Sequence, residues 1–237
     1  MLQNTYKRYQ SDVKNIFHLG GWCIGCFRKK IMKVINLIVG QLKTNCYLVF
    51  DKETRVCLII DPGDDVDYIM KIIADEKLKP VKIIATHGHF DHILAVTELK
   101  LAYNIPFLMH KDDEFLLERM NSSVKFFLGV NSKIPIPKVD EYLENGDSLQ
   151  IANCELKIVS TPGHTPGGIT LYCKKEKLAF VGDLVFAGGA VGRTDFAYSS
   201  HEDLQKSIEK ILKLPGDTKL YCGHGEVTTI FEFKKDF

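Results

Sequence analysis

The chain has 237 residues, of which 45% are apolar and 26% are charged, which is enough for one large domain or two small ones around a buried core. No apolar run approaches the ~20 residues of a membrane-spanning helix, so we expect no membrane association. The net charge of +1 is unevenly distributed, because residues 1–33 carry seven Lys or Arg against one acidic residue. The rest of the chain is acidic on balance, which argues against a nucleic-acid partner.

The first 31 residues differ in character from the rest. They hold the only tryptophan, in a Trp22–Cys26 string similar to a thioredoxin-type redox motif, but no βαβ pattern surrounds it. The basic cluster follows the apolar stretch instead of preceding it, so a usual signal peptide is not indicated. We expect residues 1–31 to be an appendage outside the fold, with Met32 as a candidate native start, and residues 32–237 to form the folded, functional domain.

The cysteines do not suggest a disulfide framework. There are seven of them, an odd number, and five are scattered through apolar stretches of the body. Buried free thiols in a reducing compartment account for this usage, so we expect a cytoplasmic protein.

From Met32 the chain is predicted to alternate short strands and helices. Helices are expected after Asp61–Asp65, near 93–103, near 111–119 and at 201–213, the last capped by Ser199 or Ser200. Residues 120–139 are expected to be irregular, and Asn145-Gly146 to be a hairpin turn. Strands are expected at 33–39, 44–50, 56–60, 81–85, 106–109, 140–144, 148–151, 154–160, 168–173, 178–182 and 218–222. This mixture predicts two sheets with helices outside them.

A dense group of side chains that can bind metal ions follows the buried strand at 81–85 directly. Three histidines and one aspartate stand there in an H-x-H-x-D-H pattern: His87, His89, Asp91 and His92. At a strand-to-helix turn they can point into one cavity, and imidazole with carboxylate suits zinc or iron. Three later strands also end in a His or Asp beside glycine. These residues are His164, Asp183 and His224, and together the seven side chains predict a metal site.

With these motifs the sequence resembles the metallo-β-lactamase fold superfamily, and within it type II glyoxalase-like (hydroxyacylglutathione hydrolase-like) proteins. The resemblance covers nearly all of 32–237, including Asn45-Cys46-Tyr47, Asp61-Pro62-Gly63 and Gly192–Phe196. It implies an α/β (α+β) fold, a four-layer αββα sandwich with the metal site at the edge of the two sheets. It also implies two divalent metal ions per chain, zinc first, with iron or manganese as alternatives.

The resemblance implies a role for each of these residues. His87, His89 and His164 correspond to ligands of a first metal ion, Asp91, His92 and His224 to ligands of a second, and Asp183 to a bridge between them. Asp91 and Asp183 are the implied catalytic carboxylates. Asp61 either supports the ligand loops or is a plain turn residue. Arg193 either orients a substrate carboxylate or pairs with Asp195 to shape its loop.

We expect the chemistry to be hydrolysis. Two ions ~3.5–4 Å apart can bind a bridging water and lower its pKa, which yields a hydroxide nucleophile. The expected substrate is a small-molecule thioester or ester, first a hydroxyacylglutathione-like thioester. Type II glyoxalases carry a long C-terminal helical region that helps to hold glutathione, whereas this sequence ends at Phe237, so another small thiol or a generic ester stays an alternative.

Three other functions fit these motifs less well. The persulfide dioxygenase branch of the superfamily, with a single iron, shares the Gly192–Phe196 string, but the intact His224 and the second ligand set argue against it. A nuclease is disfavoured by the acidic body, and a structural zinc site is disfavoured because four ligands close such a site. The sequence gives no indication of oligomeric state.

The remaining histidines and one aromatic stripe are assigned no role in catalysis. His18 lies in the appendage, His110 is expected to be structural or at the surface, and His201 is expected to be solvated. The stripe Phe126–Leu128 is expected to be core or a pocket wall.

Overall fold

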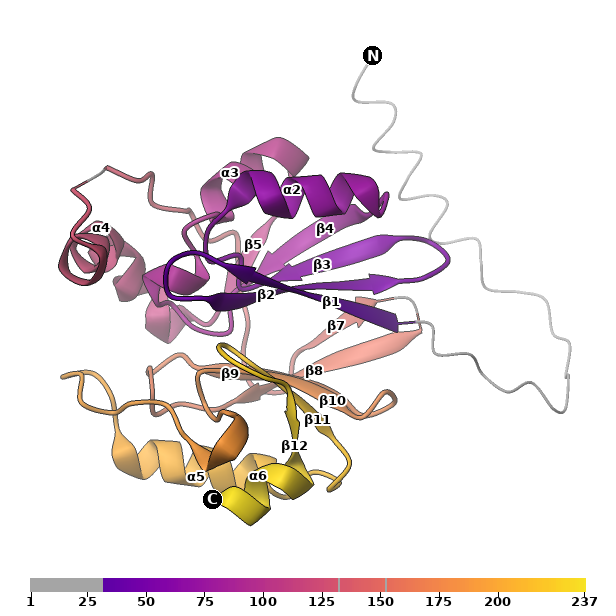
Figure 1. The fold of residues 1–237 in the computed structure, drawn as a ribbon, viewed down its shortest axis with the longest axis vertical. Coiled ribbons are helices and arrows are strands. Elements are labelled where there is room, and N and C mark those ends of the chain that lie inside the picture. The colour runs from indigo at the N-terminus through magenta and orange to yellow at the C-terminus, as the bar shows by residue number, and fades with distance from the viewer. Residues whose placement is uncertain (1–31, 132, 152) are drawn as a thin grey trace, which may run out of the picture.

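The computed structural model describes residues 32–131, 133–151 and 153–237, and the appendage predicted at 1–31 lies outside the described residues. The described chain folds into two six-stranded sheets, with helices on their outer faces (Figure 1). The predicted αββα arrangement is confirmed. Within these residues no helix has the length and apolar character needed to cross a bilayer.

The first sheet comes from the first half of the chain and has the strand order β1-β2-β3-β4-β5-β6. β1, β2 and β3 are antiparallel neighbours, whereas β3 to β6 pair in parallel. Its strands are β1 (Met32–Val39), β2 (Thr44–Asp51), β3 (Val56–Ile60), β4 (Lys79–Ile84), β5 (Phe107–Met109) and β6 (Glu141–Tyr142). The helices α2 (Val66–Asp75), α3 (Val96–Tyr103) and α4 (Glu114–Leu128) contribute to the hydrophobic core on its outer face. The short 3₁₀ turns η1 (Phe90–His92) and η2 (Lys111–Asp113) connect these elements.

The second sheet has the order β12-β11-β10-β9-β8-β7 and is antiparallel except for the β10–β11 pair. Its strands are β7 (Ser148–Ile151), β8 (Cys154–Ser160), β9 (Ile169–Cys173), β10 (Leu178–Gly182), β11 (Lys219–Cys222) and β12 (Thr228–Thr229). The helices α5 (His201–Ile211) and α6 (Ile230–Asp236) cover its outer face (Figure 1). The turn η3 (Ala187–Gly189) follows β10.

Alternation along β2 shows how one strand serves two cores. Cys46, Leu48 and Phe50 belong to the core under the first-half helices. Tyr47 and Val49 belong to the core between the two sheets, where they meet residues of the second sheet. Because successive side chains of a strand point to opposite faces, an unbroken apolar run is what a strand buried on both faces requires.

Two predictions from the sequence were wrong. The helix expected near 111–119 continues as α4 to Leu128, because Met120 and Val124 extend its buried face through residues predicted to be irregular. It ends at Gly129, whose φ of 68° is the left-handed conformation of a helix C-cap. Asn145-Gly146 is not the turn of a hairpin, since β6 pairs with β5 and β7 pairs with β8, so that this turn carries the chain from one sheet to the other.

A buried carboxylate joins the loops of the two halves. Asp113, which is fully buried, accepts hydrogen bonds from the backbone N–H of Gly88 (2.8 Å) and Gly167 (2.6 Å) and from the hydroxyl of Thr165 (2.7 Å). Burial raises the pKa of the Asp113 carboxyl, and the three donors oppose that rise by stabilising its ionised form. The loop after β4 is thereby held against the loop after β8.

We predict that Asp113→Ala lowers the free energy of unfolding by about 2–4 kcal/mol, because it leaves three buried donors without an acceptor. Denaturant unfolding measures this change. The matched control is Asp112→Ala, whose side chain is 63% exposed and whose effect is expected to stay within about 0.5 kcal/mol. Equal effects of the two substitutions would contradict the role given to Asp113.

Candidate metal centre

All seven predicted ligand side chains lie together at one edge of the two sheets. β3 and β4 are parallel neighbours, as are β10 and β11, so the residues that follow these strands meet at a common edge. The loop after β4 and η1 supply four of the seven, and loops after β8, β10 and β11 supply one each. Three groups have ligand atoms within 4.8 Å of one another: His87, His89 and His164; His87, His92 and Asp183; Asp91, His92 and His224.

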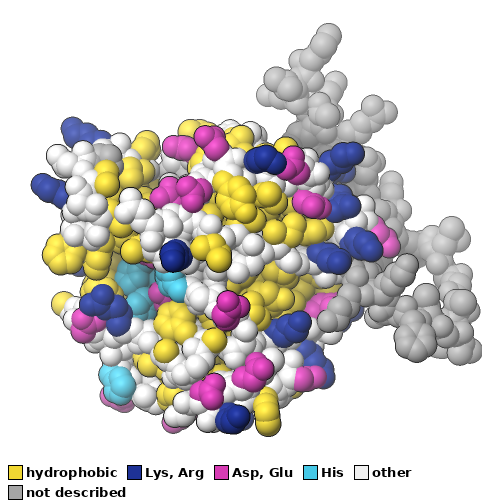
Figure 2. Space-filling model, viewed as in Figure 1, with side chains coloured by type: hydrophobic (Ala, Val, Ile, Leu, Met, Phe, Trp, Pro, Cys, Tyr) yellow, Lys and Arg dark blue, Asp and Glu magenta, His cyan; other side chains and the backbone are white. Residues whose placement is uncertain are grey.

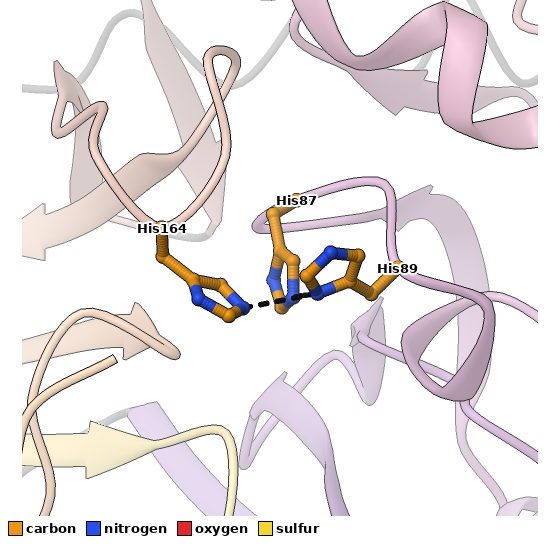
Figure 3. A group of neighbouring side chains, drawn as sticks. All are labelled: His87, His89 and His164. Atoms are coloured by element: carbon orange, nitrogen blue, oxygen red, sulfur yellow. Dashed lines mark hydrogen bonds between the residues drawn. The ribbon is translucent and has the colours of Figure 1, made fainter. Parts of the chain in front are cut away.

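Three ring nitrogens converge in the first group (Figure 3). His87 Nε2 lies 3.1 Å from His89 Nδ1, and His89 Nδ1 lies 3.0 Å from His164 Nε2. Imidazole binds zinc at about 2.0–2.1 Å, so three nitrogens this close together can share one cation. Without a cation, one His89 nitrogen cannot satisfy both neighbouring lone pairs with a single proton.

The second group combines imidazoles with carboxylates. Asp91 Oδ2 lies 3.3 Å from His224 Nε2 and 3.8 Å from His92 Nε2. Asp183 stands between the two groups, because its Oδ1 is 3.5 Å from His92 Nε2 whereas its Oδ2 is 3.7 Å from His164 Nε2. Among the described residues, both ring nitrogens of His92 and Asp183 Oδ1 are buried without a hydrogen-bond partner, although Asp61 Oδ2 lies 3.1 Å from His92 Nδ1. These unpartnered atoms and the mixed nitrogen and oxygen donors fit divalent zinc, iron or manganese.

Each of the five imidazoles is held from outside by its other ring nitrogen. The outer neighbours are two backbone carbonyls, one carboxylate and two hydroxyls, all of which can accept from the outer nitrogen, so each contact is compatible with a proton there and a free lone pair on the inner nitrogen. The five pairs are His87 with Thr86 Oγ1 (3.2 Å), His89 with Tyr198 Oη (2.9 Å), His92 with Asp61 Oδ2 (3.1 Å), His164 with the Arg193 carbonyl (2.8 Å) and His224 with the Leu42 carbonyl (3.1 Å).

Asp61 supports the ligand loop and is not a plain turn residue. It is 1% exposed and accepts hydrogen bonds from both the backbone N–H and the hydroxyl of Thr86, each at 2.7 Å. Its Oδ2 also faces His92 Nδ1. One carboxylate therefore fixes Thr86 at the start of the ligand loop and the orientation of His92 six residues after it.

The loop that carries His224 belongs to the second sheet but is held by the first. The hydroxyl of Tyr47 (2.6 Å) and the side-chain amide of Asn45 (3.0 Å) both donate to the carbonyl of Cys222. The backbone N–H of Asn45 donates to the carbonyl of Gly223 at 2.7 Å. The Asn45-Cys46-Tyr47 string noted in the sequence thus docks the last ligand loop.

Electrostatics divides the cluster into a neutral and a charged part. Burial, together with the neighbouring imidazoles, holds the pKa values of His87 and His89 well below the usual range, which favours the unprotonated form that binds metals. Burial also opposes a charge on His92, but Asp183, Asp91 and Asp61 outweigh it and raise its pKa to about 10. Burial likewise opposes ionisation of Asp91, whereas His92 and His224 hold its pKa well below the usual range. Cation binding here displaces protons.

Sequence reasoning did not identify Tyr198. Its hydroxyl holds His89, and its ring stacks on Phe196 with centroids 5.2 Å apart. Burial raises the pKa of the Tyr198 hydroxyl to about 12, so that it stays neutral. A lone tyrosine without ligand spacing gives no sequence signal, and only its place two residues after Gly192–Phe196 hinted at the site.

Arg193 forms the pair with Asp195 that was one of its two predicted roles. Nε lies 2.6 Å from Oδ1 and Nη2 lies 2.5 Å from Oδ2, and the guanidinium stacks over Phe196 at 4.5 Å. Of the other histidines, His110 accepts a hydrogen bond from the Asp112 backbone and His201 is exposed at the start of α5, while His18 lies outside the described residues.

Residues 39–224 match the family model of the metallo-beta-lactamase superfamily. The chain belongs to this superfamily. The hydroxyacylglutathione hydrolase GloC of Haemophilus influenzae is 32% identical over 212 residues, covering 86% of this chain and 96% of that protein. The crystal structure of the BLEG-1 B3 metallo-beta-lactamase matches with a TM-score of 0.79 at 33% identity, covering 86% of this chain and 97% of that one. The di-iron-bound form of TTHA1623 matches with a TM-score of 0.77 at 31% identity, covering 86% and 98%.

A glycine next to His224 is required by close packing in this member of the superfamily. A Cβ at Gly223 would lie 2.0 Å from Asp183 Oδ1 and 2.8 Å from His92 Cε1. We predict that Gly223→Ala displaces Asp183 and weakens metal binding although no ligand is replaced. Metal that binds only the folded chain stabilises it by about 4 kcal/mol at 1,000 times its Kd, and the variant is expected to lose most of this stabilisation.

Thermal unfolding with zinc and with a chelator measures that difference, and metal analysis gives the stoichiometry. Gly216→Ala is the matched control, because its Cβ would meet only the Phe231 side chain at 3.9 Å. A Gly223→Ala protein with the metal content and thermal shift of the wild type would refute the packing argument.

A second prediction concerns the hydroxyl that holds His89. Tyr198→Phe removes this acceptor and leaves the ring in place, so we expect metal affinity to fall about 10–100-fold. Competition with a chromophoric chelator measures the affinity. Tyr68→Phe, at a half-exposed tyrosine on α2, is the control and is expected to leave affinity unchanged. Unaltered affinity in Tyr198→Phe would show that the contact does not orient the ligand.

Proposed function

We propose that this chain is a binuclear metal-dependent hydrolase that cleaves thioesters, first those of the hydroxyacylglutathione type. The observation that carries the proposal is the arrangement of five outward-anchored imidazoles and two carboxylates into adjoining ligand groups, with Asp183 between them. We assign His87, His89 and His164 to one ion and Asp91, His92 and His224 to the other. The identity with GloC, a hydroxyacylglutathione hydrolase, supports the choice of thioester.

Divalent ions in these groups would supply Lewis-acid activation of a carbonyl and a lowered pKa for water. In thioester hydrolysis the water oxygen bonds to the acyl carbon, the carbon–sulfur bond breaks, and a carboxylic acid and a thiol form. Asp91 and Asp183, whose side chains are 15% and 13% exposed, face the adjoining pocket and are the proposed catalytic carboxylates that accept the proton of the water. The five described cysteines are buried free thiols and none lines this pocket, so a cysteine nucleophile is not needed.

The alternative function is a persulfide dioxygenase with one iron. The Gly192–Phe196 string favours it, because the persulfide dioxygenase branch of the superfamily shares that string. His224 next to Asp91 and His92 favours the hydrolase, since a single-iron centre leaves these ligands without use. Metal stoichiometry therefore separates the two functions.

We predict hydrolysis of S-lactoylglutathione by the purified protein with two ions per chain. His87→Ala and Asp183→Ala are expected to lose metal and to lower kcat by roughly 10³-fold or more, equivalent to over 4 kcal/mol. His201→Ala, at an exposed histidine on α5, is the matched control and should retain both metal and rate. A chromogenic cephalosporin tested in parallel compares thioester with β-lactam cleavage, because BLEG-1 is a B3 metallo-beta-lactamase.

The results of these metal and turnover measurements distinguish the hydrolase from the dioxygenase. One iron per chain with oxygen uptake on a persulfide would establish the dioxygenase instead. No turnover of S-lactoylglutathione with both sites filled would reject the glutathione thioester while leaving superfamily membership intact. Full activity in His87→Ala or Asp183→Ala would reject the ligand assignment.

A further inference from the structure

A pocket of about 160 Å³ adjoins the ligand cluster. Four cluster side chains form one wall: His89, Asp91, His164 and Asp183. The facing walls are largely apolar and consist of Leu42, Phe90, Phe127, Phe196 and Tyr198. In the space-filling view, histidine side chains appear at the surface between hydrophobic ones (Figure 2). Whatever fills this pocket is attached close to the reacting atoms.

The aromatic walls are held in place by stacking. Phe90 and Phe127 are stacked with centroids 5.8 Å apart and ring planes at 20°, and Phe196 and Tyr198 are stacked at 5.2 Å and 10°. Phe115 packs edge-on against Tyr198 from behind, at 5.4 Å. Because these rings support each other, the pocket offers a preformed slot for a flat apolar group.

The pocket has no free positive charge among the described residues that line it. Arg193 is its single Lys or Arg, and Asp195 binds the guanidinium through two hydrogen bonds. Arg193 holds the pKa of Asp195 at about 2, so that the pair stays ionised and is neutral in sum at physiological pH. An anionic group entering the pocket would find no unpaired Lys or Arg side chain to bind.

Size restricts the occupant further. An apolar cavity of about 150 Å³ in another protein is known to hold benzene, so a pocket of about 160 Å³ matches a six-membered ring. The tripeptide glutathione is much larger and carries two carboxylates. The pocket therefore suits a substituent of the substrate and not its peptide thiol.

We infer that the pocket binds a ring-sized apolar substituent on the acyl group of the thioester. The inference rests on the proposed function, because it takes the scissile carbonyl to lie against the ligand cluster. A substituent on the α-carbon of the acyl group begins two bonds from the carbonyl carbon, whereas a ring on a benzyl thiol begins three bonds from it. Groups on the thiol side begin beyond the sulfur, and in glutathione they are polar, so they extend away from the aromatic walls.

The test compares two thioesters of the same thiol. S-Mandeloylglutathione and S-lactoylglutathione are both 2-hydroxyacyl thioesters and differ only in a phenyl group in place of a methyl group. We expect kcat/KM to be at least about tenfold higher for the mandeloyl compound, since burial of even one methylene changes specificity by about that factor. A third substrate, the S-lactoyl thioester of benzyl mercaptan, places the ring on the thiol side and is expected to gain no such advantage.

Two variants change the pocket in opposite ways. Phe127→Ala removes a wall whose side chain is 44% exposed, so the fold should tolerate it, and Ser123→Phe fills the pocket from α4. Both should reduce the ratio of kcat/KM for the mandeloyl compound to that for lactoylglutathione about tenfold. Phe231→Ala is the matched control, because this phenylalanine of α6 is 71% exposed and does not line the pocket.

Binding of the products provides a readout independent of turnover. Calorimetry is expected to show that mandelate binds about tenfold more tightly than lactate, and that Phe127→Ala removes this difference. Equal kcat/KM for the two acyl groups, a preference that survives both pocket variants, or a ring preference on the thiol side would overturn the inference. No hydrolysis of any of the three thioesters would reject the proposed function. The binding of mandelate relative to lactate would then still test whether the pocket holds a ring.

Discussion

The metal centre depends on hydrogen bonds that point away from it. Each of its five imidazoles has a polar neighbour outside the cluster at one ring nitrogen, which orients the ring so that the other nitrogen is directed inward. These neighbours come from loops of both halves of the chain. The sheets, the loop docking by Asn45 and Tyr47 and the carboxylates of Asp61 and Asp113 all serve to keep these outer contacts in place.

Sequence reasoning recovered the parts of the fold that depend on local pattern. The strands over 56–60, 148–151 and 154–160 have the predicted bounds, because apolar alternation ended by turn residues is a local signal. The extension of α4 to Leu128 was missed, since its buried face is defined by contacts with η1 and the shared core, which come from elsewhere along the chain. The hairpin at Asn145-Gly146 was wrong because a turn sequence does not specify which strand becomes the partner.

For the candidate site too, the sequence revealed the residues that form a local pattern and not those that act over a distance along the chain. Dense spacing made the first four ligand positions evident, and the grouping of all seven into two sets came from the resemblance to the superfamily. Tyr198 and Asp113 were missed, because each acts on residues far away along the chain and neither belongs to a recognisable spacing. Side chains that orient the metal-ligand residues do so because the fold brings them close in space, so a single sequence does not reveal them.

His89 and His164, 75 positions apart, present their nitrogens to each other from opposite halves of the molecule. A cation held between them would link the two halves only in the folded chain, and it would stabilise the fold through its binding free energy because it is released when the chain unfolds. The described cysteines are all unpaired, so in this part of the chain no disulfide links the two halves. The chemistry that would make the centre reactive would therefore also clamp the two layers of the sandwich together.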